Sequence, residues 1–343
     1  MKNRRQFGFS LVELMVGLTV SLLLIGVIGS TYLSGRQTSR VVDTMGRLQE
    51  SARFALETIE QDIRISGFRG CNSAANSPIN TLNSPTAYNN RFDQPLFGYH
   101  ASGSTWSPVL DASISSFSPA PLAGRDVVSI KRIYGNGTAL TAQMVGSTGP
   151  LVIDSGSAFT QGDIALVADC EAQAVFQVTN QPTTGSIAHV ATTAVTPGNA
   201  TADLTQVFNT DASVYRVVTK TYYIAPSARK PGVNLNSLWS SSVPDYAGSG
   251  QPAELVEGVD NLVLLYGEDT DGDQAANRYV TADNVANWNN VISVRLQVLM
   301  ETVQDGVAPV VQTYTFNGST LTATDRRIRS VFTSVITLRN RVM

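Results

Sequence analysis

The chain has 343 residues, of which 43% are hydrophobic and only 15% charged, whereas about a quarter of the residues of a soluble domain are usually charged. The net charge is −3, and removing residues 1–8, which hold three basic and no acidic residues, would leave −6. This balance excludes the basic surface typical of nucleic-acid-binding proteins. We therefore expect no nucleic-acid partner for the isolated C-terminal region.

The first element is an apolar segment near the amino terminus. Residues 14–33 carry no charge, and a helix of this length spans about 30 Å, the hydrocarbon thickness of a bilayer. Lys2, Arg4 and Arg5 precede it and favour a cytoplasmic amino terminus. A secretory signal has its small-residue cleavage site after the apolar run, whereas here Gly8 precedes the run. The segment therefore predicts a retained single-pass membrane helix.

The stretch RRQFGFSLVELMVGLTVSLLL resembles the amino terminus of type IV prepilins and type II secretion pseudopilins. In that family a basic leader ends in glycine, phenylalanine follows, and glutamate occupies the fifth place after the cut; Gly8, Phe9 and Glu13 match these places. The resemblance implies cleavage between Gly8 and Phe9 by a prepilin peptidase, N-methylation of Phe9, and a pilin-like α+β fold. In that fold a long N-terminal helix packs on a mostly antiparallel β head.

Glu13 is a carboxylate at the edge of the apolar run. An isolated acidic side chain in lipid costs roughly 2.5–3.5 kcal/mol on insertion scales, so it needs a partner. The resemblance implies that the helices bundle in a filament, where Glu13 faces the positive amino terminus of a neighbouring subunit. The alternative is that Glu13 only marks the membrane interface, with its carboxylate among the headgroups.

Beyond the membrane segment, apolar residues recur every three to four positions, which predicts an amphipathic helix that packs on a sheet. We expect this second half of the helix to end near residues 67–70; a free coiled-coil stalk is the alternative. The apolar positions are Val42, Met45, Leu48 or Gln49, Ala52, Ala55 or Leu56, Ile59 and Ile63.

The remainder is predicted to be mostly β structure. Residues 72–125 are rich in Asn, Ser, Pro and Gly, so we expect a long irregular connection there with at most a short strand or turn, and its aromatic residues pack it onto the head. Residues 226–252 are interpreted as a second long loop. Strand-like runs occupy residues 126–134, 163–169, 174–179, 213–225, 254–267, 290–300 and 326–340.

These elements give four segments. Residues 1–8 form a leader, 9–35 the membrane and filament-core helix, 36–70 its amphipathic half, and 71–343 an enlarged β head. The head is interpreted as one or two subdomains, with a boundary near residues 200–250.

A second resemblance concerns the subtype. The stretches ISGFRGC (65–71), ELVEGVDNLVLLYGEDTDGDQAANRYV (254–280), WNNVISVRLQVLM (288–300) and RRIRSVFTSVITLRNR (326–341) resemble PilW-type minor pilins of Gram-negative type IV pili. The resemblance covers the first 70 residues and roughly 254–343. It implies a subunit that helps to initiate the pilus and sits at or near its tip, with roles in twitching motility, adhesion or DNA uptake.

The partners implied are other minor pilins, the major pilin, the prepilin peptidase, the pilus assembly platform and inner-membrane lipid. The location implied is the inner membrane, with the leader cytoplasmic and the head periplasmic, and then the pilus on the cell surface. The alternatives are a minor pseudopilin of a type II secretion system and, from another class, a tip adhesin or binding module.

Cys71 and Cys170 are the two cysteines. In an exported chain they predict one disulfide, which would close a loop of about 100 residues and contribute about 4–5 kcal/mol in the loop-entropy treatment. The alternative is two buried free thiols.

The acidic run EDTDGDQAANRY raises the question of a metal site. Asp269, Asp271 and Asp273 alternate along it, and Ca²⁺ prefers six to eight oxygen ligands, which Asn277 would help to supply. An EF-hand requires glycine at the sixth place and glutamate at the twelfth, where this chain has Gln274 and Val280. A looser Ca²⁺ loop and a solvated acidic turn both fit the sequence.

No other cofactor is expected. The sequence lacks Gly-x-Ser-x-Gly, His-Glu-x-x-His, Gly-x-x-x-x-Gly-Lys and Cys-x-x-Cys, the local patterns of nucleophilic, zinc, nucleotide and redox chemistry. We therefore expect a structural protein and no catalytic residues.

Overall fold

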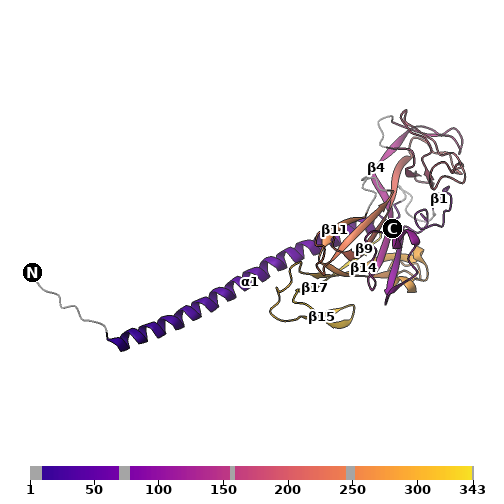
Figure 1. The fold of residues 1–343 in the computed structure, drawn as a ribbon. Coiled ribbons are helices and arrows are strands. Elements are labelled where there is room, and N and C mark those ends of the chain that lie inside the picture. The colour runs from indigo at the N-terminus through magenta and orange to yellow at the C-terminus, as the bar shows by residue number, and fades with distance from the viewer. Residues whose placement is uncertain (1–9, 69–77, 155–158, 245–251, 342–343) are drawn as a thin grey trace, which may run out of the picture.

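The computed structural model describes residues 10–68, 78–154, 159–244 and 252–341. It consists of one long helix, α1 (Leu11–Ile65), whose C-terminal part packs on a β-rich head while the rest projects away from it (Figure 1). This arrangement confirms the predicted α+β, pilin-like fold.

Local sequence explains where α1 begins and ends. Ser10 is the N-cap, and its side chain accepts a hydrogen bond from the backbone N–H of Glu13 at 3.2 Å, which satisfies one of the free donors of the first turn. The helix ends at Ile65, and Gly67 follows with φ +67°, a conformation that favours glycine. The predicted end near residues 67–70 is therefore close to the observed one.

Only the last third of α1 is buried. From residue 48 onward one face packs on the head, as the apolar stripe predicts, and the stalk alternative is wrong for this part of the helix. The buried residues are Leu48, Ala52, Ala55, Ile59, Asp62 and Ile63. Val42, which belongs to the predicted stripe, is 63% exposed, so the apolar contact with the head begins later along the helix than the stripe predicts.

The larger sheet has 11 strands, and its main path runs in the order β1-β7-β6-β9-β4-β2-β3. All of its pairings are antiparallel except that of β1 with β7. Its strands are β1 (Ile79–Asn80), β2 (Leu96–Ser102), β3 (Thr105–Ser107), β4 (Val127–Ala142), β5 (Leu151–Ile153), β6 (Ile164–Ala168), β7 (Gln173–Gln177), β8 (Ser186–Ile187), β9 (Ser213–Pro226), β10 (Asn236–Val243) and β11 (Ala253–Glu257). A short helix, α2 (Ala112–Ser115), lies between β3 and β4.

The smaller sheet is antiparallel, in the order β13-β12-β14-β17. Between β14 and β17 the chain forms a separate hairpin of β15 and β16, which lies beside the smaller sheet (Figure 1). The bounds are β12 (Val259–Glu268), β13 (Arg278–Val280), β14 (Val291–Glu301), β15 (Thr313–Phe316), β16 (Ser319–Thr322) and β17 (Arg329–Thr337), with 3₁₀ turns η1 (Ala282–Asn284) and η2 (Trp288–Asn290).

Two main cores form the head. The first lies between α1 and the faces of both sheets and includes Ile59, Ile130 and Leu296. The second is built around β5–β8 and includes Leu151 and Phe176. The strands β4 and β9 are long enough to reach both cores, so they join the part of the head beside α1 to a distal lobe.

Three sequence expectations need correction. Residues 72–125 contain β1–β3 and α2, which is more regular structure than the one short strand or turn expected, although Tyr88 and Tyr99 within them are buried as expected. The loop predicted at 226–252 contains β10, which pairs with both β9 and β11. The run at 254–267 forms two strands separated by Gly258, whose φ is +77° and where a Cβ atom would lie 2.4 Å from the carbonyl oxygen of Glu301.

Candidate functional site

The surface most suited to assembly is the projecting part of α1. Its apolar side chains from Leu11 to Leu33 are at least half exposed, and the most apolar stretch of the helix is not buried against the head. By length and composition this helix can cross a membrane. In water the exposed apolar surface would be strongly unfavourable, so it requires either lipid or other apolar helices.

The predicted processing residues Gly8 and Phe9 lie outside the described residues. Glu13 lies in the first turn of α1 and is exposed. A carboxylate in the first turn is favourable because the helix dipole is positive there. Because Glu13 follows the cap residue Ser10 by three positions, its backbone N–H is satisfied by the cap.

A buried ion cluster attaches α1 to the head. The Asp62 carboxylate lies 2.8 Å from Arg132 Nε on β4 and 3.2 Å from Lys220 Nζ on β9, and it accepts a 2.5 Å hydrogen bond from the Tyr222 hydroxyl. Burial, together with the Asp62 charge, raises the pKa of Tyr222 far above its usual value, so the hydroxyl remains a donor. Three groups from the two long strands therefore converge on one helix residue.

Sequence reasoning missed Asp62, although a signal existed. It lies three residues after Ile59 and next to Ile63, within the apolar face, where a lone acid must be paired. Its partners come from strands 70 and 158 residues later, and nothing in the local sequence identifies them.

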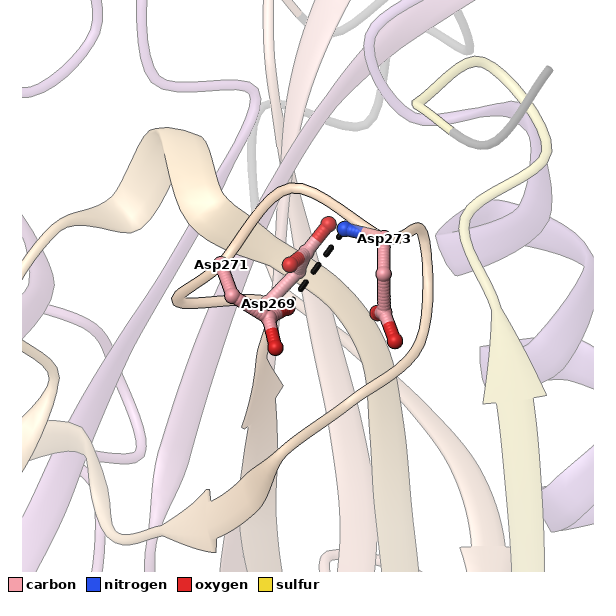
Figure 2. A group of neighbouring side chains, drawn as sticks. All are labelled: Asp269, Asp271 and Asp273. Carbon is pink, nitrogen blue, oxygen red and sulfur yellow. Dashed lines mark hydrogen bonds between the residues drawn. The ribbon is translucent and has the colours of Figure 1, made fainter.

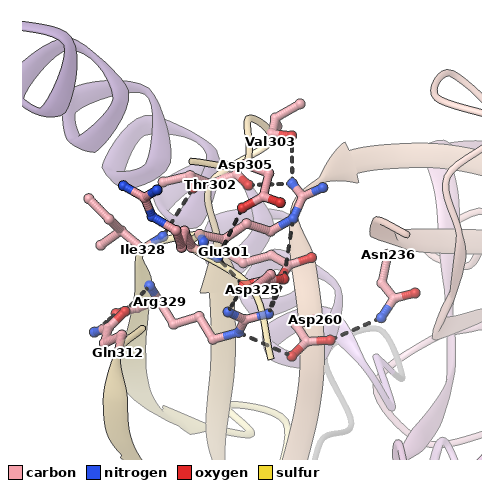
Figure 3. Close-up of polar contacts among 12 residues, drawn as sticks. Asn236, Asp260, Glu301, Thr302, Val303, Asp305, Gln312, Asp325, Ile328 and Arg329 are labelled. Carbon is pink, nitrogen blue, oxygen red and sulfur yellow. Dashed lines mark hydrogen bonds and ion pairs between the residues drawn. The ribbon is translucent and has the colours of Figure 1, made fainter. Parts of the chain in front are cut away.

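A second polar cluster lies where β14 and β17 meet (Figure 3). Arg329 Nη2 lies 2.6 Å from Glu301 Oε2, Arg329 Nη1 lies 2.6 Å from Asp325 Oδ1, and its Nε lies 3.8 Å from Asp260 Oδ2. Burial and the nearby Asp260 raise the pKa of Glu301 to about 7, against the opposing effect of Arg329. The cluster fixes both ends of the segment between β14 and β17.

The predicted metal residues lie in the β12–β13 turn (Figure 2). One carboxylate oxygen from each of Asp269, Asp271 and Asp273 lies within 4.8 Å of the others. The structure thus brings the three aspartates together, as the alternating spacing predicts.

Hydrogen bonds within the turn already use much of this oxygen. Asp269 accepts hydrogen bonds from the N–H groups of Gly272 at 2.7 Å and Gln274 at 3.0 Å. Desolvation raises the pKa of Asp269, but the hydrogen bonds to its carboxylate outweigh this effect, and the pKa is lowered overall. Asn277 Oδ1 accepts from both the N–H and the hydroxyl of Thr270. These bonds favour the acidic-turn interpretation for Asn277, and Ca²⁺ binding by the aspartates stays a prediction.

Cys170 lies between β6 and β7, whereas Cys71 lies outside the described residues. The disulfide between them therefore stays a prediction.

Two protein-family models match parts of the chain. A family described as Type IV Pilus-assembly protein W (PilW) matches residues 221–340, from within β9 to just beyond β17. The prokaryotic N-terminal methylation motif matches residues 3–29, which include Gly8, Phe9 and Glu13. No match was found among curated proteins or among solved structures. The methylation motif, the projecting apolar helix on an antiparallel β head and the C-terminal match together support a type IV pilus minor pilin of the PilW kind.

Proposed function

We propose that this minor pilin helps to initiate the type IV pilus and occupies a position at or near its tip. The observation that carries the proposal is the helix, whose buried face begins at residue 48 and which exposes apolar side chains along residues 11–33. Such a surface is satisfied first by the inner membrane and then by the apolar helices of other minor pilins and the major pilin.

The proposed assembly mechanism is helix bundling with a charge that sets the register. After cleavage before Phe9, the methylated amino terminus of one subunit is positive, and Glu13 of its neighbour lies four residues from that end. A carboxylate that is unfavourable alone in lipid becomes favourable when a positive group approaches it. The prepilin peptidase and the assembly platform supply the processing and the mechanical work.

We propose a structural role without catalysis, and a pilus in preference to a type II secretion system. The match of residues 221–340 to a pilus-assembly family supports both choices. The segment boundaries at residues 8, 35 and 70 and a head of two subdomains are part of the same proposal. The leader would lie in the cytoplasm and the head in the periplasm until assembly brings the subunit to the cell surface.

The test combines processing with piliation. Gly8→Val leaves the leader uncut, and Glu13→Val removes the charge that the neighbour requires, so both variants should lose pili and twitching motility. Mass spectrometry of the wild-type protein should find an N-methylated Phe9 as the first residue.

Glu57→Val is the matched control, because Glu57 is an exposed acid on the same helix outside the apolar segment. It should leave pilus number unchanged. Normal piliation in both the Gly8 and Glu13 variants would refute the proposal, and a mature chain that begins at Met1 would remove its basis.

A further inference from the structure

The segment between β14 and β17, residues 302–328, is here called the arm. It leaves the smaller sheet, approaches α1, and returns through the β15–β16 hairpin (Figure 1). Gln37 Nε2 donates a 3.3 Å hydrogen bond to the Val307 carbonyl, and Arg40 Nη2 donates a 3.2 Å bond to Gln304 Oε1. The arm therefore contacts α1 on the membrane side of residue 48, where the buried face of the helix begins.

The position of these contacts along the helix places the arm relative to the bilayer. If residues 14–33 span the hydrocarbon, the headgroup layer extends roughly 5–7 Å further, or about four residues of helix. Gln37 lies within this interval. Tyr32 and Arg36 also place the membrane interface at this part of α1. The Arg36 guanidinium lies 5.6 Å from the Tyr32 ring centre, and aromatic and basic side chains are typical of the membrane interface.

The part of the arm next to this contact exposes apolar residues. Val310 is 71% and Val311 46% exposed, and Pro309 beside them is also exposed. Both flanks are fixed: the Ala308 N–H donates to the Arg326 carbonyl at 2.9 Å, and Gln312 Nε2 donates to the Arg329 carbonyl at 2.8 Å. Residues 309–311, here called the tip, are therefore an exposed apolar segment whose two ends are fixed by hydrogen bonds.

The charges near the tip suit a phosphate-bearing surface. The helix turn at residues 34–42 contains Arg36 and Arg40 and no acidic residue. The arm has two acidic and two basic residues, so it has no net charge that would repel an anionic headgroup layer.

We propose that, before assembly, the tip of the arm rests in the interfacial layer of the membrane that α1 crosses. The head then has two attachments to the bilayer, the helix and the tip, which restrict its tilt. The tip must leave the lipid when the subunit enters a filament. This inference rests on the proposed membrane stage of the protein, and the experiment separates the two.

The test uses the full chain in vesicles of phosphatidylethanolamine and phosphatidylglycerol, with an environment-sensitive fluorophore on Val310→Cys. Lipids with a nitroxide on the headgroup should reduce its emission roughly twofold or more, since quenching requires proximity to the headgroup layer. Val145→Cys is the matched control, because Val145 is 85% exposed but lies in the distal lobe. It should be unaffected, and the parent chain without an added cysteine gives the background.

A fluorophore on Leu22→Cys, tested with acyl-chain nitroxides, reports insertion of the helix itself. Quenching at both 22 and 310 supports the proposal. Quenching at 22 but not at 310 overturns the proposal and leaves the membrane stage intact, whereas no quenching at 22 overturns both. Equal headgroup quenching at 145 and 310 also overturns it, because the contact would not be specific to the tip.

Discussion

Lys131, on β4, is a cationic residue inside the head. It is 4% exposed, and its ammonium group lies 5.3 Å from the centre of the Tyr88 ring. Its pKa is lowered from 10.5 to about 7, chiefly by burial and also by the charge of Arg91, while Asp93 acts in the opposite direction. Because the charged form is disfavoured in the folded state, Lys131 destabilises the protein at every pH at which the unfolded chain carries its proton.

Lys131→Met should therefore increase the free energy of unfolding by about 3 kcal/mol below pH 7, after allowing for the lost contact with Tyr88. The unfolded chain binds this proton up to about pH 10.5 and the folded chain only up to about pH 7. Wild-type stability should thus rise through this window, and the advantage of the variant should shrink. Urea unfolding of the detergent-solubilised chain at pH 6 and pH 9.5, followed by tryptophan fluorescence, measures both values.

Lys230→Met provides the control for this series, since Lys230 is exposed and its replacement should change stability little. If Lys131→Met increased the free energy of unfolding equally at both pH values, packing and not the buried charge would be responsible.

At the scale of elements, α1 packs mainly on β17 and β14, and Asp62 adds a polar contact with β4 and β9. Apolar residues on one helix face provide most of the contact area, but apolar packing alone tolerates sliding of a helix along a sheet. Asp62 has fixed partners at 2.8 and 3.2 Å and so specifies one register. We infer that this cluster sets the direction in which the head projects from α1.

Asp62→Asn keeps the shape of the side chain but leaves Arg132 and Lys220 without their counter-charge. Breaking a buried ion cluster in this way should cost about 2–4 kcal/mol, measured as a lower urea midpoint and faster proteolysis after the helix. Asp43→Asn, an exposed acid on the same helix, should have no comparable effect. Equal stability of the two variants would mean that the apolar face alone fixes the helix.

At the scale of the whole molecule, β4 and β9 are the only strands that contribute to both the core beside α1 and the distal core, within the described residues. The predicted Cys71–Cys170 disulfide would give a further covalent link between the segment that follows α1 and the turn between β6 and β7. It would restrict the unfolded chain over about 100 residues.

Cys170→Ser should accordingly lower the free energy of unfolding by up to about 4–5 kcal/mol, and a reducing agent should have the same effect on the wild-type protein. Alkylation of the unreduced, denatured chain followed by mass spectrometry should find no modified cysteine. Two alkylated cysteines in protein purified from the membrane fraction would show that the thiols are free.

Local sequence determined a large part of this protein. The uncharged run at 14–33 predicted the projecting helix, and the three-to-four spacing from residue 42 predicted the buried face that begins at residue 48. The apolar runs predicted the first half of β4, and β6, β7, β9, β14 and β17, whereas one run was predicted where β11 and β12 form two strands. The local sequence also identified the residues proposed for processing and assembly, Gly8, Phe9 and Glu13, because all parts of a linear motif lie within a few residues of one another.

Tertiary structure decided the rest. The segment NSLWSSSV became the paired strand β10 because β9 and β11 on either side satisfy its backbone, although its serines show no strand-like alternation. Asp62 came to contact β4 and β9, and Gln304 and Val307 came to contact a part of the helix more than 260 residues earlier. These outcomes depend on hydrogen bonds and ion pairs between distant segments, whose free energy arises only after the sheets have formed, so no local pattern of residues specifies them.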